Sequence, residues 1–263
     1  ATENAVETLR ALRTRWQADK DKQHEALGEI QMALGLSEPP NRIECYDIST
    51  IQGTASVGSM VVFEQGVANK KLYRRFNIRN VEGQDDFACM EETLTRRFRQ
   101  WRAQQEIAQT PGKKVDLAFS LLPDLLIVDG GKGQLARAMK VLEDYGLSDQ
   151  VPVAGLAKQE EEFFLPNRKE SIRLDDHSQG FYLVQRIRDE AHRFAITAHR
   201  TRRGKIGLAS RLDAISGLGP ARRKALLLKF GSIDGILAAP AEEIAAIKGI
   251  TLELAQAIKT QLE

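Results

Sequence analysis

Three side chains far apart in the sequence, Asp47, Asp129 and His192, have the chemistry for phosphodiester hydrolysis. That reaction needs a water molecule made nucleophilic near neutral pH and compensation of the charge that builds up on phosphorus. One or two hard divalent cations held by carboxylates supply both. Two carboxylates set close together are costly without a cation, so their convergence would indicate a site for Mg²⁺ or Mn²⁺.

The role of His192 has two interpretations. Neutral imidazole binds Mg²⁺ less well than a carboxylate does but is acceptable to Mn²⁺, so His192 could be a metal ligand. It could equally take the proton of the attacking water. The sequence decides neither this question nor the number of metal ions. Each residue also has an ordinary structural interpretation, because Asp47 and Asp129 could shape turns at strand ends and His192 could lie on an exposed helix face.

Other residues near these positions are weaker candidates. Asp86 begins a predicted helix, where an acid caps the helix or compensates its dipole, although it could also be a fourth acid near the site. Lys158 follows a predicted strand and could contact a phosphate, although such lysines are more often simply solvated. The glycine-rich run 130–133 fails the spacing of a P-loop. It could form a backbone nest for a phosphate oxygen or a tight strand-to-helix turn.

The elements that must position these residues follow from the periodicity of apolar side chains. Residues 1–35 are expected to form an amphipathic helix that ends at Gly35 and the two prolines after it. The polar stretch 158–177 could hold a small hairpin. The remaining predicted elements are strands at 42–48, 57–63 and within 67–78, a helix at 86–102, a strand at 124–129, a helix at 134–145, a strand at 151–156 and a helix at about 179–200.

This order predicts an α/β fold with a ribonuclease H-like mixed sheet flanked by helices. Three strands with short connections indicate an antiparallel meander. The strand 124–129 is apolar on both faces and belongs in the parallel part of a sheet. In such a topology the first strand and the end of the fourth lie side by side, and the last helix crosses near them. Asp47, Asp129 and His192 occupy those three places.

The C-terminal region contains an internal repeat with an offset of 32 residues, because 215–219 and 225–226 match 247–251 and 257–258. Each copy has the pattern of a helix, a glycine-containing hairpin and a second helix. Residues 208–263 are therefore expected to form a small all-α tandem helix-hairpin-helix domain in which the two copies bury a common core.

The first hairpin is suited to binding the DNA backbone. Gly217 and Gly219 would let a phosphate approach the free amides at a helix start, where Pro220 has a preset dihedral and the helix dipole favours an anion. Such contact positions a protein on DNA and reads no sequence. Three basic residues follow at once: Arg222, Arg223 and Lys224.

The second hairpin, with Lys248 and Gly249, departs from this pattern. Thr251 stands where the first hairpin has its second glycine and could cap the following helix instead. The second copy could therefore be purely structural, and its contact with DNA is left open.

Positive charge is concentrated in one segment of a chain whose formal net charge is only +2. Between Arg193 and Gly231 ten lysines and arginines stand against one acid, Asp213. This excess is either a footprint for a phosphate backbone or a solvated, mobile linker. The predicted domains are a helical segment at 1–40, the ribonuclease H-like domain at 41–200, a basic linker at 201–207 and the hairpin domain at 208–263.

Composition excludes several classes of protein. The chain has 42% hydrophobic and 28% charged residues, and no apolar run approaches the ~20 residues of a membrane helix. Two cysteines cannot form a disulfide scaffold, and no CxxC pair exists for zinc, which indicates a reducing compartment such as the cytoplasm. No signal peptide is evident, and the start at Ala1 suggests a piece of something longer.

Taken together, these residues resemble the C-terminal half of the UvrC family, the incision nucleases of bacterial nucleotide excision repair. The resemblance covers nearly everything from residue 42 to residue 263. It rests on the final hairpin pair and on five stretches: 43–53 (IECYDISTIQG), 73–76 (YRRF), 85–87 (DDF), 123–134 (PDLLIVDGGKGQ) and 188–194 (RDEAHRF).

The resemblance implies a metal-dependent DNA endonuclease that cuts on the 5′ side of a lesion, with the family's Asp-Asp-His triad at Asp47, Asp129 and His192. It also implies damaged double-stranded DNA as substrate, a UvrB-type damage-loading protein as partner of the full-length member, and the bacterial cytoplasm as location. The family's N-terminal GIY-YIG nuclease, which makes the 3′ cut, and its UvrB-docking module are not evident in this sequence. We therefore expect a fragment without the 3′ activity.

Two other functions stay open. A non-catalytic DNA-binding scaffold with a degenerate ribonuclease H-like core is possible, but a scaffold need not keep both acids and the histidine. Another ribonuclease H-like nuclease, such as one acting on deaminated bases, would not need the hairpin pair as a second DNA clamp.

Overall fold

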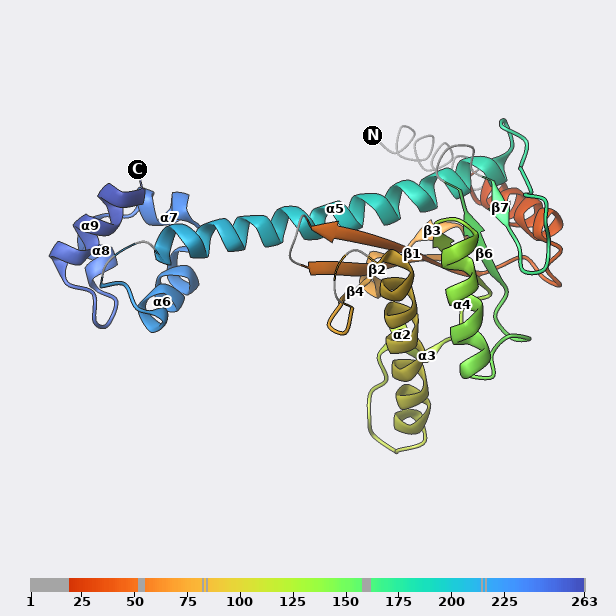
Figure 1. Ribbon diagram of the computed structural model, residues 1–263, viewed down its shortest axis with the longest axis horizontal. Coiled ribbons are helices and arrows are strands. Elements are labelled where there is room, and N and C mark those ends of the chain that lie inside the picture. The colour runs from red at the N-terminus through yellow and green to blue at the C-terminus, as the bar shows by residue number, and fades with distance from the viewer. Residues whose placement is uncertain are drawn as a thin grey trace, which may run out of the picture. The chain divides into compact units, whose positions relative to one another are not determined.

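The computed structural model describes residues 19–51, 55–81, 83, 85–157, 162–213, 215 and 217–262 (Figure 1). The chain divides into two compact units on either side of the bond between Ile196 and Thr197. The first contains a mixed sheet with helices, and the described residues of the second form helices. The predicted fold class is confirmed, whereas the finer domain limits stay a prediction.

Among the described residues, seven strands form one mixed sheet in the order β3-β2-β1-β5-β6-β7, with β4 also paired to β2. β1 is antiparallel to β2 and parallel to β5, which is itself parallel to β6. The antiparallel start and the parallel middle of the sheet are therefore as predicted. The strands are β1 (Arg42–Ile51), β2 (Ala55–Glu64), β3 (Val67–Ala68), β4 (Arg74–Asn77), β5 (Leu125–Asp129), β6 (Val153–Leu156) and β7 (Phe163–Phe164), with a 3₁₀ turn, η1 (Lys70–Leu72), before β4.

Helices cover both faces of this sheet (Figure 1). One layer packs on Leu126 and Val128, and the other packs on Ile43 and Ile127. β5 is buried along its whole length because it has a helical layer on each face. The first layer consists of α2 (Asp86–Ala108), α3 (Leu117–Ser120) and α4 (Lys132–Asp144), and the second of the helical residues 19–34 and the first part of α5 (Gln179–Asp213).

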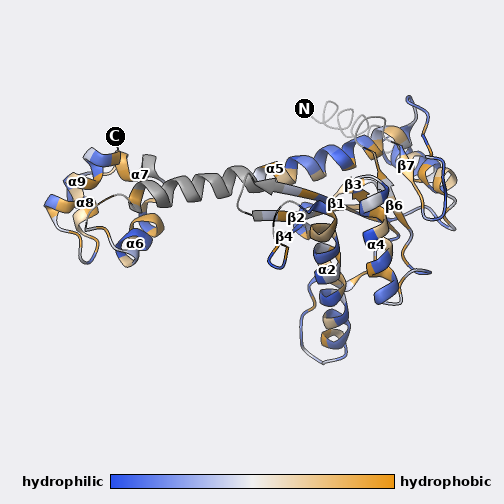
Figure 2. Ribbon diagram, viewed as in Figure 1, coloured by the Kyte–Doolittle hydropathy of each residue, from blue (hydrophilic) through white to orange (hydrophobic). Residues whose placement is uncertain are grey.

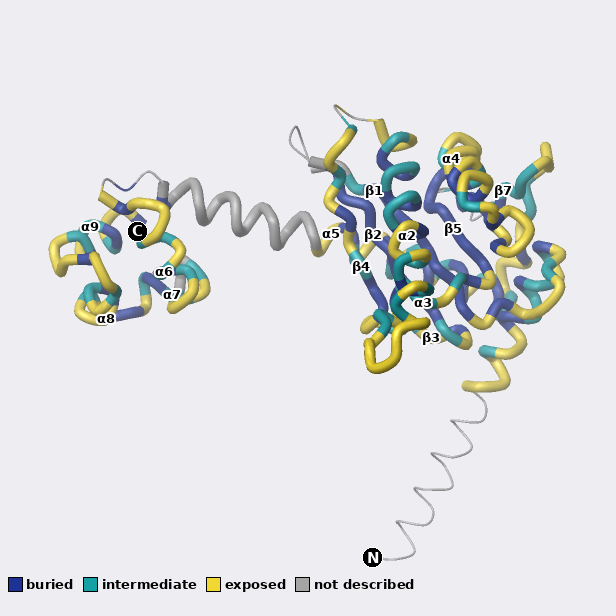
Figure 3. The backbone as a smooth tube through the Cα atoms, turned by 90° about the horizontal axis from the view of Figure 1, so that it is seen from below, coloured by how far each residue is buried: buried dark blue, intermediate teal, exposed yellow. Residues whose placement is uncertain are grey.

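The amphipathic pattern of the sequence matches this layering. Apolar residues recur along one side of α2 and α4 while the other side is polar (Figure 2). Met90, Leu94 and Phe98 of α2 have no exposed surface. Figure 3 shows the same arrangement from below, with β1 and β5 buried and the outer turns of the helices exposed. Burial of apolar side chains on both faces of the sheet therefore holds the strands between the two helical layers.

Several helices are longer than predicted. α2 continues to Ala108, and α3 is a short helix that the periodicity did not indicate. α5 runs to Asp213, past the predicted end at about residue 200, so the backbone of the segment 201–207 is helical, while its role as a basic linker stays a prediction. That segment lacks proline and is rich in arginine and lysine, which favour helix, so its two glycines cost only about 1 kcal/mol each.

Two smaller expectations are confirmed. The N-terminal helix, described from residue 19, ends at Gly35, whose φ of +67° favours glycine. The polar stretch 158–177 contains a small hairpin, in which Phe163 bridges Ile172 in antiparallel fashion.

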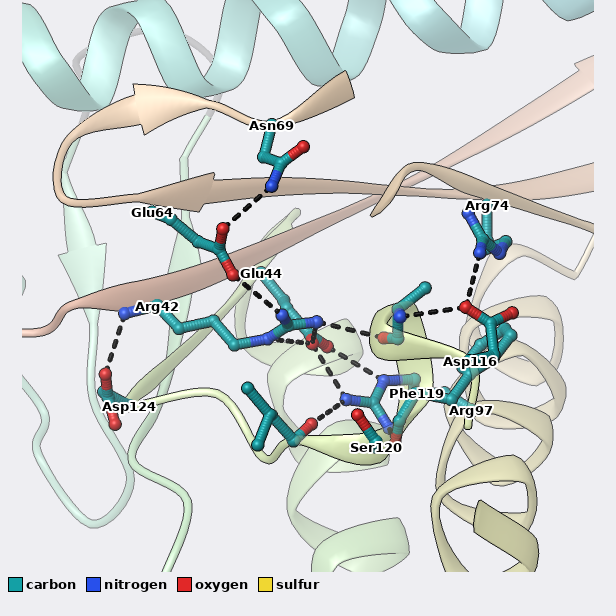
Figure 4. A network of polar contacts seen from close by, with 12 residues as sticks. Arg42, Glu44, Glu64, Asn69, Arg74, Arg97, Asp116, Phe119, Ser120 and Asp124 are labelled. Atoms are coloured by element: carbon teal, nitrogen blue, oxygen red, sulfur yellow. Dashed lines mark hydrogen bonds and ion pairs between the residues drawn. The ribbon is translucent and has the colours of Figure 1, made fainter. Parts of the chain in front are cut away.

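A buried ionic network fixes β1 against α2 (Figure 4). Glu44 accepts hydrogen bonds from Arg97 (2.8 Å), Arg42 (2.8 Å) and the hydroxyl of Tyr46 (2.6 Å). Burial alone would raise the pKa of Glu44, but Arg97 and Arg42 hold it below its usual value. Glu44 lies three residues before Asp47, so this network fixes the strand that carries the first candidate acid.

The second unit follows the predicted repeat. α6 and α9 begin 32 residues apart, and each has 11 residues. Equivalent residues are buried in one core, Leu218 with Ile250 and Leu226 with Ile258. The common core of the two copies is therefore confirmed. The helices that follow α5 are α6 (Pro220–Phe230), α7 (Ile233–Ala238), α8 (Ala241–Ala245) and α9 (Leu252–Leu262).

Candidate functional site

Asp47 and Asp129 lie side by side on neighbouring parallel strands. The register pairs Tyr46 with Val128, and the next residue on each strand is the candidate acid. Neighbouring strands are about 4.8 Å apart, and residues at the same level point to the same face. Both acids are buried, with 3% and 4% of their surface exposed. The sheet thus brings two carboxylates together where β5 ends.

The thiol of Cys45 lies close enough to both acids for their charges to raise its pKa. It lies two residues before Asp47, so it points to the same face of β1, and it has no exposed surface. Burial raises the pKa of its thiol well above the usual value, and the negative charges of Asp129 and Asp47 raise it further. The two carboxylates therefore act on one region of low dielectric.

His192 of α5 lies next to the first acid. Its Nδ1 atom is 3.9 Å from Oδ2 of Asp47. The imidazole is open to solvent, with 66% of the side chain exposed, whereas Asp47 is buried. The structure therefore gathers Asp47, Asp129 and His192, while their roles stay a prediction.

Side chains of the β4 region hold the turn of α5 that carries His192. The hydroxyl of Tyr73 donates to Glu190 at 3.1 Å, and its ring meets Phe194 edge to face, with centroids 5.1 Å apart. Arg75 stacks over the Phe194 ring, 4.1 Å from its centroid, and donates to the backbone oxygen of Phe194 at 3.0 Å. These contacts lie on either side of His192 along the helix, so they position it relative to the sheet.

The sequence analysis named the stretch 73–76 but gave its residues no function. Their position follows from register, since Arg75 pairs with Ser59 and Ser59 pairs with Asp47. The sequence showed one strand within 67–78, whereas the structure has two, both paired to β2. Because the start of β4 was not known, the sequence could not show which of residues 73–76 point to the same face of the sheet as Asp47.

Asp86 lies exposed in the first turn of α2, but it is not the cap. Asp85 is the N-cap, and its carboxylate accepts the N–H groups of Phe87 and the residue after it, both at 3.0 Å. A Cβ at Gly133 would come within 2.5 Å of the Phe87 ring, so the start of α2 packs against the start of α4. This contact places Asp86 at the end of the sheet where Asp129 lies.

Two other candidates near the site have different outcomes. Lys158 lies outside the described residues. The run 130–133 forms the predicted tight turn, because β5 ends at Asp129 and α4 begins at Lys132 with Gly131 as its N-cap. A Cβ at Gly130 would overlap the amide end of the Gln134 side chain, which would then have to move.

The first hairpin has an open helix start. Gly217 has a φ of +82°, and Gly219 is the N-cap of α6 with Pro220 after it. Gly219 offers no side chain to the first amides of α6, so those N–H groups can donate to an external anion. Arg222 donates to the backbone oxygen of Gly217 at 2.7 Å and so stabilises the hairpin itself, while Lys224 is exposed.

The second hairpin has the same backbone conformation, but a side chain caps the helix that follows it. Gly249 has a φ of +87°, close to that of Gly217. Thr251 Oγ1 accepts the N–H of Leu254 at 3.2 Å, so Thr251 caps α9 as the sequence predicted. Lys248 is exposed on this hairpin. The two hairpins therefore share their conformation and differ in the availability of helix amides.

Two family models match the chain. Residues 31–196 match the model described as the UvrC RNAse H endonuclease domain, and residues 209–263 match the SAM-like helix-hairpin-helix tandem. The chain belongs to the UvrC family. Its two matched regions correspond to the sheet-containing unit and to the repeat of helices.

Curated relatives of this UvrC-family chain carry the name UvrABC system protein C. That of Dehalococcoides mccartyi is 48% identical over 260 residues, which cover 99% of this chain and 41% of the relative. That of Beutenbergia cavernae is 45% identical over 284 residues, which cover 98% of this chain and 41% of the relative. The chain thus spans about two fifths of the length of these relatives.

Solved structures add little to this UvrC-family assignment. Endonuclease V of Ciona intestinalis, solved with a DNA that contains inosine, has a TM-score of 0.32 and 14% identity, covering 57% of this chain and 59% of that one. A likeness at this level carries no argument about fold or function. Within the described part of the chain, no helix is long and apolar enough to cross a membrane.

Proposed function

We propose that this chain hydrolyses a phosphodiester bond of damaged double-stranded DNA, on the 5′ side of the lesion, during nucleotide excision repair. The observation that carries the proposal is the convergence of Asp47, Asp129 and His192 in a chain of the UvrC endonuclease family. The cleavage side and the repair pathway come from the family resemblance.

The two acids fit a hard divalent cation, Mg²⁺ or Mn²⁺. Two buried carboxylates on neighbouring strands repel each other, and a cation between them relieves that repulsion. In the described ranges no group of three or more His, Cys, Asp and Glu side chains is arranged to hold a metal ion. Mg²⁺ is usually bound through one or two carboxylates together with waters and substrate phosphates, so Asp47 and Asp129 suffice for that mode.

A bound cation would lower the pKa of a water molecule and compensate charge on phosphorus. Asp47 and Asp129 would hold it at the end of β5. His192 is beside Asp47 and open to solvent, so its imidazole can accept the proton of the attacking water or add a nitrogen ligand. Tyr73 and Arg75 keep the α5 turn in place for either role.

The helical unit would hold the DNA backbone through the open start of α6, with Lys224 adding charge. This contact orients the duplex without reading its sequence. In the full-length protein a UvrB-type damage-loading protein would deliver the damaged DNA in the bacterial cytoplasm.

The substitution Asp129→Asn tests the proposal, because asparagine keeps the size of the side chain and removes its charge. Parent and variant are compared with Mg²⁺ or Mn²⁺ on a damaged, 5′-labelled duplex loaded with a UvrB-type protein. We expect strand cleavage to be lost while DNA affinity, measured by fluorescence anisotropy, is nearly unchanged. Equal cleavage by the two proteins would contradict the assignment.

Anomalous scattering from a crystal soaked in Mn²⁺ tests the metal independently of cleavage. A peak within coordinating distance of both carboxylates supports the endonuclease. No peak and no cleavage under any metal would favour a non-catalytic DNA-binding scaffold.

A further inference from the structure

Arginines surround the edge strand β4 and the neighbouring part of α2. They line two adjoining hollows in the surface, of about 580 and 300 Å³, which share two of these residues. Figure 1 shows β4 beside α2. The arginines of this surface are Arg74, Arg75, Arg79, Arg96 and Arg99.

The acids that line the same hollows are already bound by cations. This leaves little negative charge to neutralise the remaining arginines. The pairs are Asp116 with Arg74, Glu92 with Arg96, and Glu91 with Arg137 and Lys140 of α4.

Three of the arginines keep an uncompensated charge. Arg75, Arg79 and Arg99 are exposed, and none of them forms an ion pair with a carboxylate in the part of the chain that the structure describes. A guanidinium group offers five N–H donors in a planar fork that matches a phosphate. The surface therefore carries three positive charges suited to phosphate groups.

One row of residues across the sheet connects Arg75, at the border of this surface, with the candidate nuclease site. Arg75 pairs with Ser59 on β2, Ser59 pairs with Asp47 on β1, and Asp129 follows on β5. Residues directly opposite each other in a sheet point to the same face. At the usual strand spacing the Cα atom of Arg75 is about 10 Å from that of Asp47.

The guanidinium of Arg75 is held in place on this face. It stacks on the ring of Phe194 and donates one N–H to the backbone oxygen of that residue. Because Phe194 is two residues from His192, the cation is fixed close to the group that lies against Asp47. A cation held in this way needs little ordering to bind a phosphate.

We propose that Arg75, Arg79 and Arg99 form a binding surface for the sugar–phosphate backbone of the DNA strand that is cut, with Arg75 on a phosphate next to the scissile one. The proposal rests on the proposed function and adds the path of the substrate. Arg75 borders the same hollow as Arg96 and Arg99 and lies in one row with the two acids, so a continuous polyanion that follows the arginines around the edge strand β4 from the α2 side reaches them. An acidic protein segment would have no reason to end there.

The double variant Arg79→Ala/Arg99→Ala in the full chain tests the surface. Neither side chain has a described partner, so the substitutions remove charge without breaking contacts. Binding of a fluorescent duplex is measured by anisotropy at several salt concentrations in EDTA. Each phosphate contact contributes about 0.9 to the slope of log affinity against log salt, so the slope should fall by about 1.8.

A matched control removes the same charge elsewhere. Arg168 and Arg186 are exposed and line neither hollow, so Arg168→Ala/Arg186→Ala should leave the slope nearly unchanged. Equal slopes for the two double variants would overturn the proposal. Thermal melting of both proteins verifies that they are folded.

Arg75 needs a separate control because it also contacts α5. Arg75→Ala should lower the slope by about 0.9, whereas Tyr73→Phe loosens the same turn of α5 but keeps the cation and should not change the slope. An equal fall in both variants would assign Arg75 a purely structural role and overturn its phosphate contact.

The outcome is independent of cleavage because no metal is present. Asp129-dependent cleavage with an unchanged Arg79/Arg99 slope would leave the proposed function standing and reject the surface. A reduced slope without cleavage under any metal would support the arginine surface and reject the proposed endonuclease function.

Discussion

The candidate nuclease site and the two hairpins gather their functional groups over very different sequence distances. Asp47, Asp129 and His192 are 82 and 63 residues apart and meet because β1 and β5 are neighbours and α5 lies against them. Each hairpin is built from a few consecutive residues, and the repeat builds the same backbone twice. A long-range site needs every contributor, whereas one copy of a repeat can lose a function and keep its structure.

The hairpins illustrate the second case. Both have a glycine with φ near +85°, and both are followed by an 11-residue helix. The first leaves the helix amides to an external anion, while in the second Thr251 Oγ1 accepts one of them, the N–H of Leu254. The comparison teaches that the fold of a repeat and its ability to bind phosphate are separable, and the experiments below test that separation.

The largest expected effect is at the long-range site. Asp47→Asn should reduce both Mn²⁺ affinity and cleavage by more than about 100-fold, because even outer partners of metal ligands cost 10–100-fold. Mn²⁺ at 100 times its Kd should stabilise the parent by about 2.7 kcal/mol. Calorimetry should show that rise in Tm for the parent and not for the variant. A variant that gains the same stabilisation would exclude Asp47 as a ligand.

His192→Ala should have the next largest effect. We expect cleavage to slow by about 100-fold or more, as for loss of a general base, while Mn²⁺ affinity falls far less than in Asp47→Asn. The reason is the geometry, since the imidazole is exposed and only approaches Asp47 at 3.9 Å. Titration with Mn²⁺ measures the difference. A loss of affinity as large as that of Asp47→Asn would instead make His192 a ligand.

These residues also show how far the sequence leads. The apolar run of β5 placed Asp129 at the end of a central strand, and the meander placed Asp47 on its neighbour. The internal repeat with its offset of 32 residues likewise predicted both hairpins and the cap at Thr251, because each depends only on a few consecutive residues. The roles of Asp47, Asp129 and His192 stay a prediction, because the position of a residue on a strand or helix does not determine whether it binds a metal or moves a proton.

Other features depended on contacts that a linear pattern does not contain. The contacts of Tyr73 and Arg75 with α5 depend on the register of β4 on β2, which periodicity within 67–78 does not give. Arg97 forms a buried ion pair with Glu44, whereas a charged residue in a helix normally suggests an exposed face. The helical backbone of 201–207 was not predicted, because the apolar periodicity of the preceding helix ended at about residue 200.

A smaller effect is expected when the two hairpins are compared on DNA. Lys224→Ala, beside the open start of α6, should lower the salt slope of duplex binding by about 0.9, as for one phosphate contact. Lys248→Ala removes the same charge beside the capped helix and should lower it much less. Anisotropy in EDTA measures both. Equal losses would show that capping does not decide which hairpin binds.

The smallest effect is in the caps themselves. Thr251→Ala should destabilise the helical unit by about 1 kcal/mol and leave the salt slope unchanged, because the Leu254 amide that it caps is not used for DNA. Gly219→Ser should stabilise that unit by a few tenths of a kcal/mol. Its Cβ would meet no described atom within 4 Å, and its φ of −67° suits serine.

The effect of Gly219→Ser on DNA binding is the more decisive test of the open helix start. A serine at position 219 places a hydroxyl on the amides that a phosphate would otherwise use, so Gly219→Ser should weaken duplex binding even as urea unfolding shows a more stable unit. Stability and binding would then change in opposite directions at one hairpin and not at the other. If Gly219→Ser bound DNA as well as the parent, the open amides of α6 would have no part in holding the backbone.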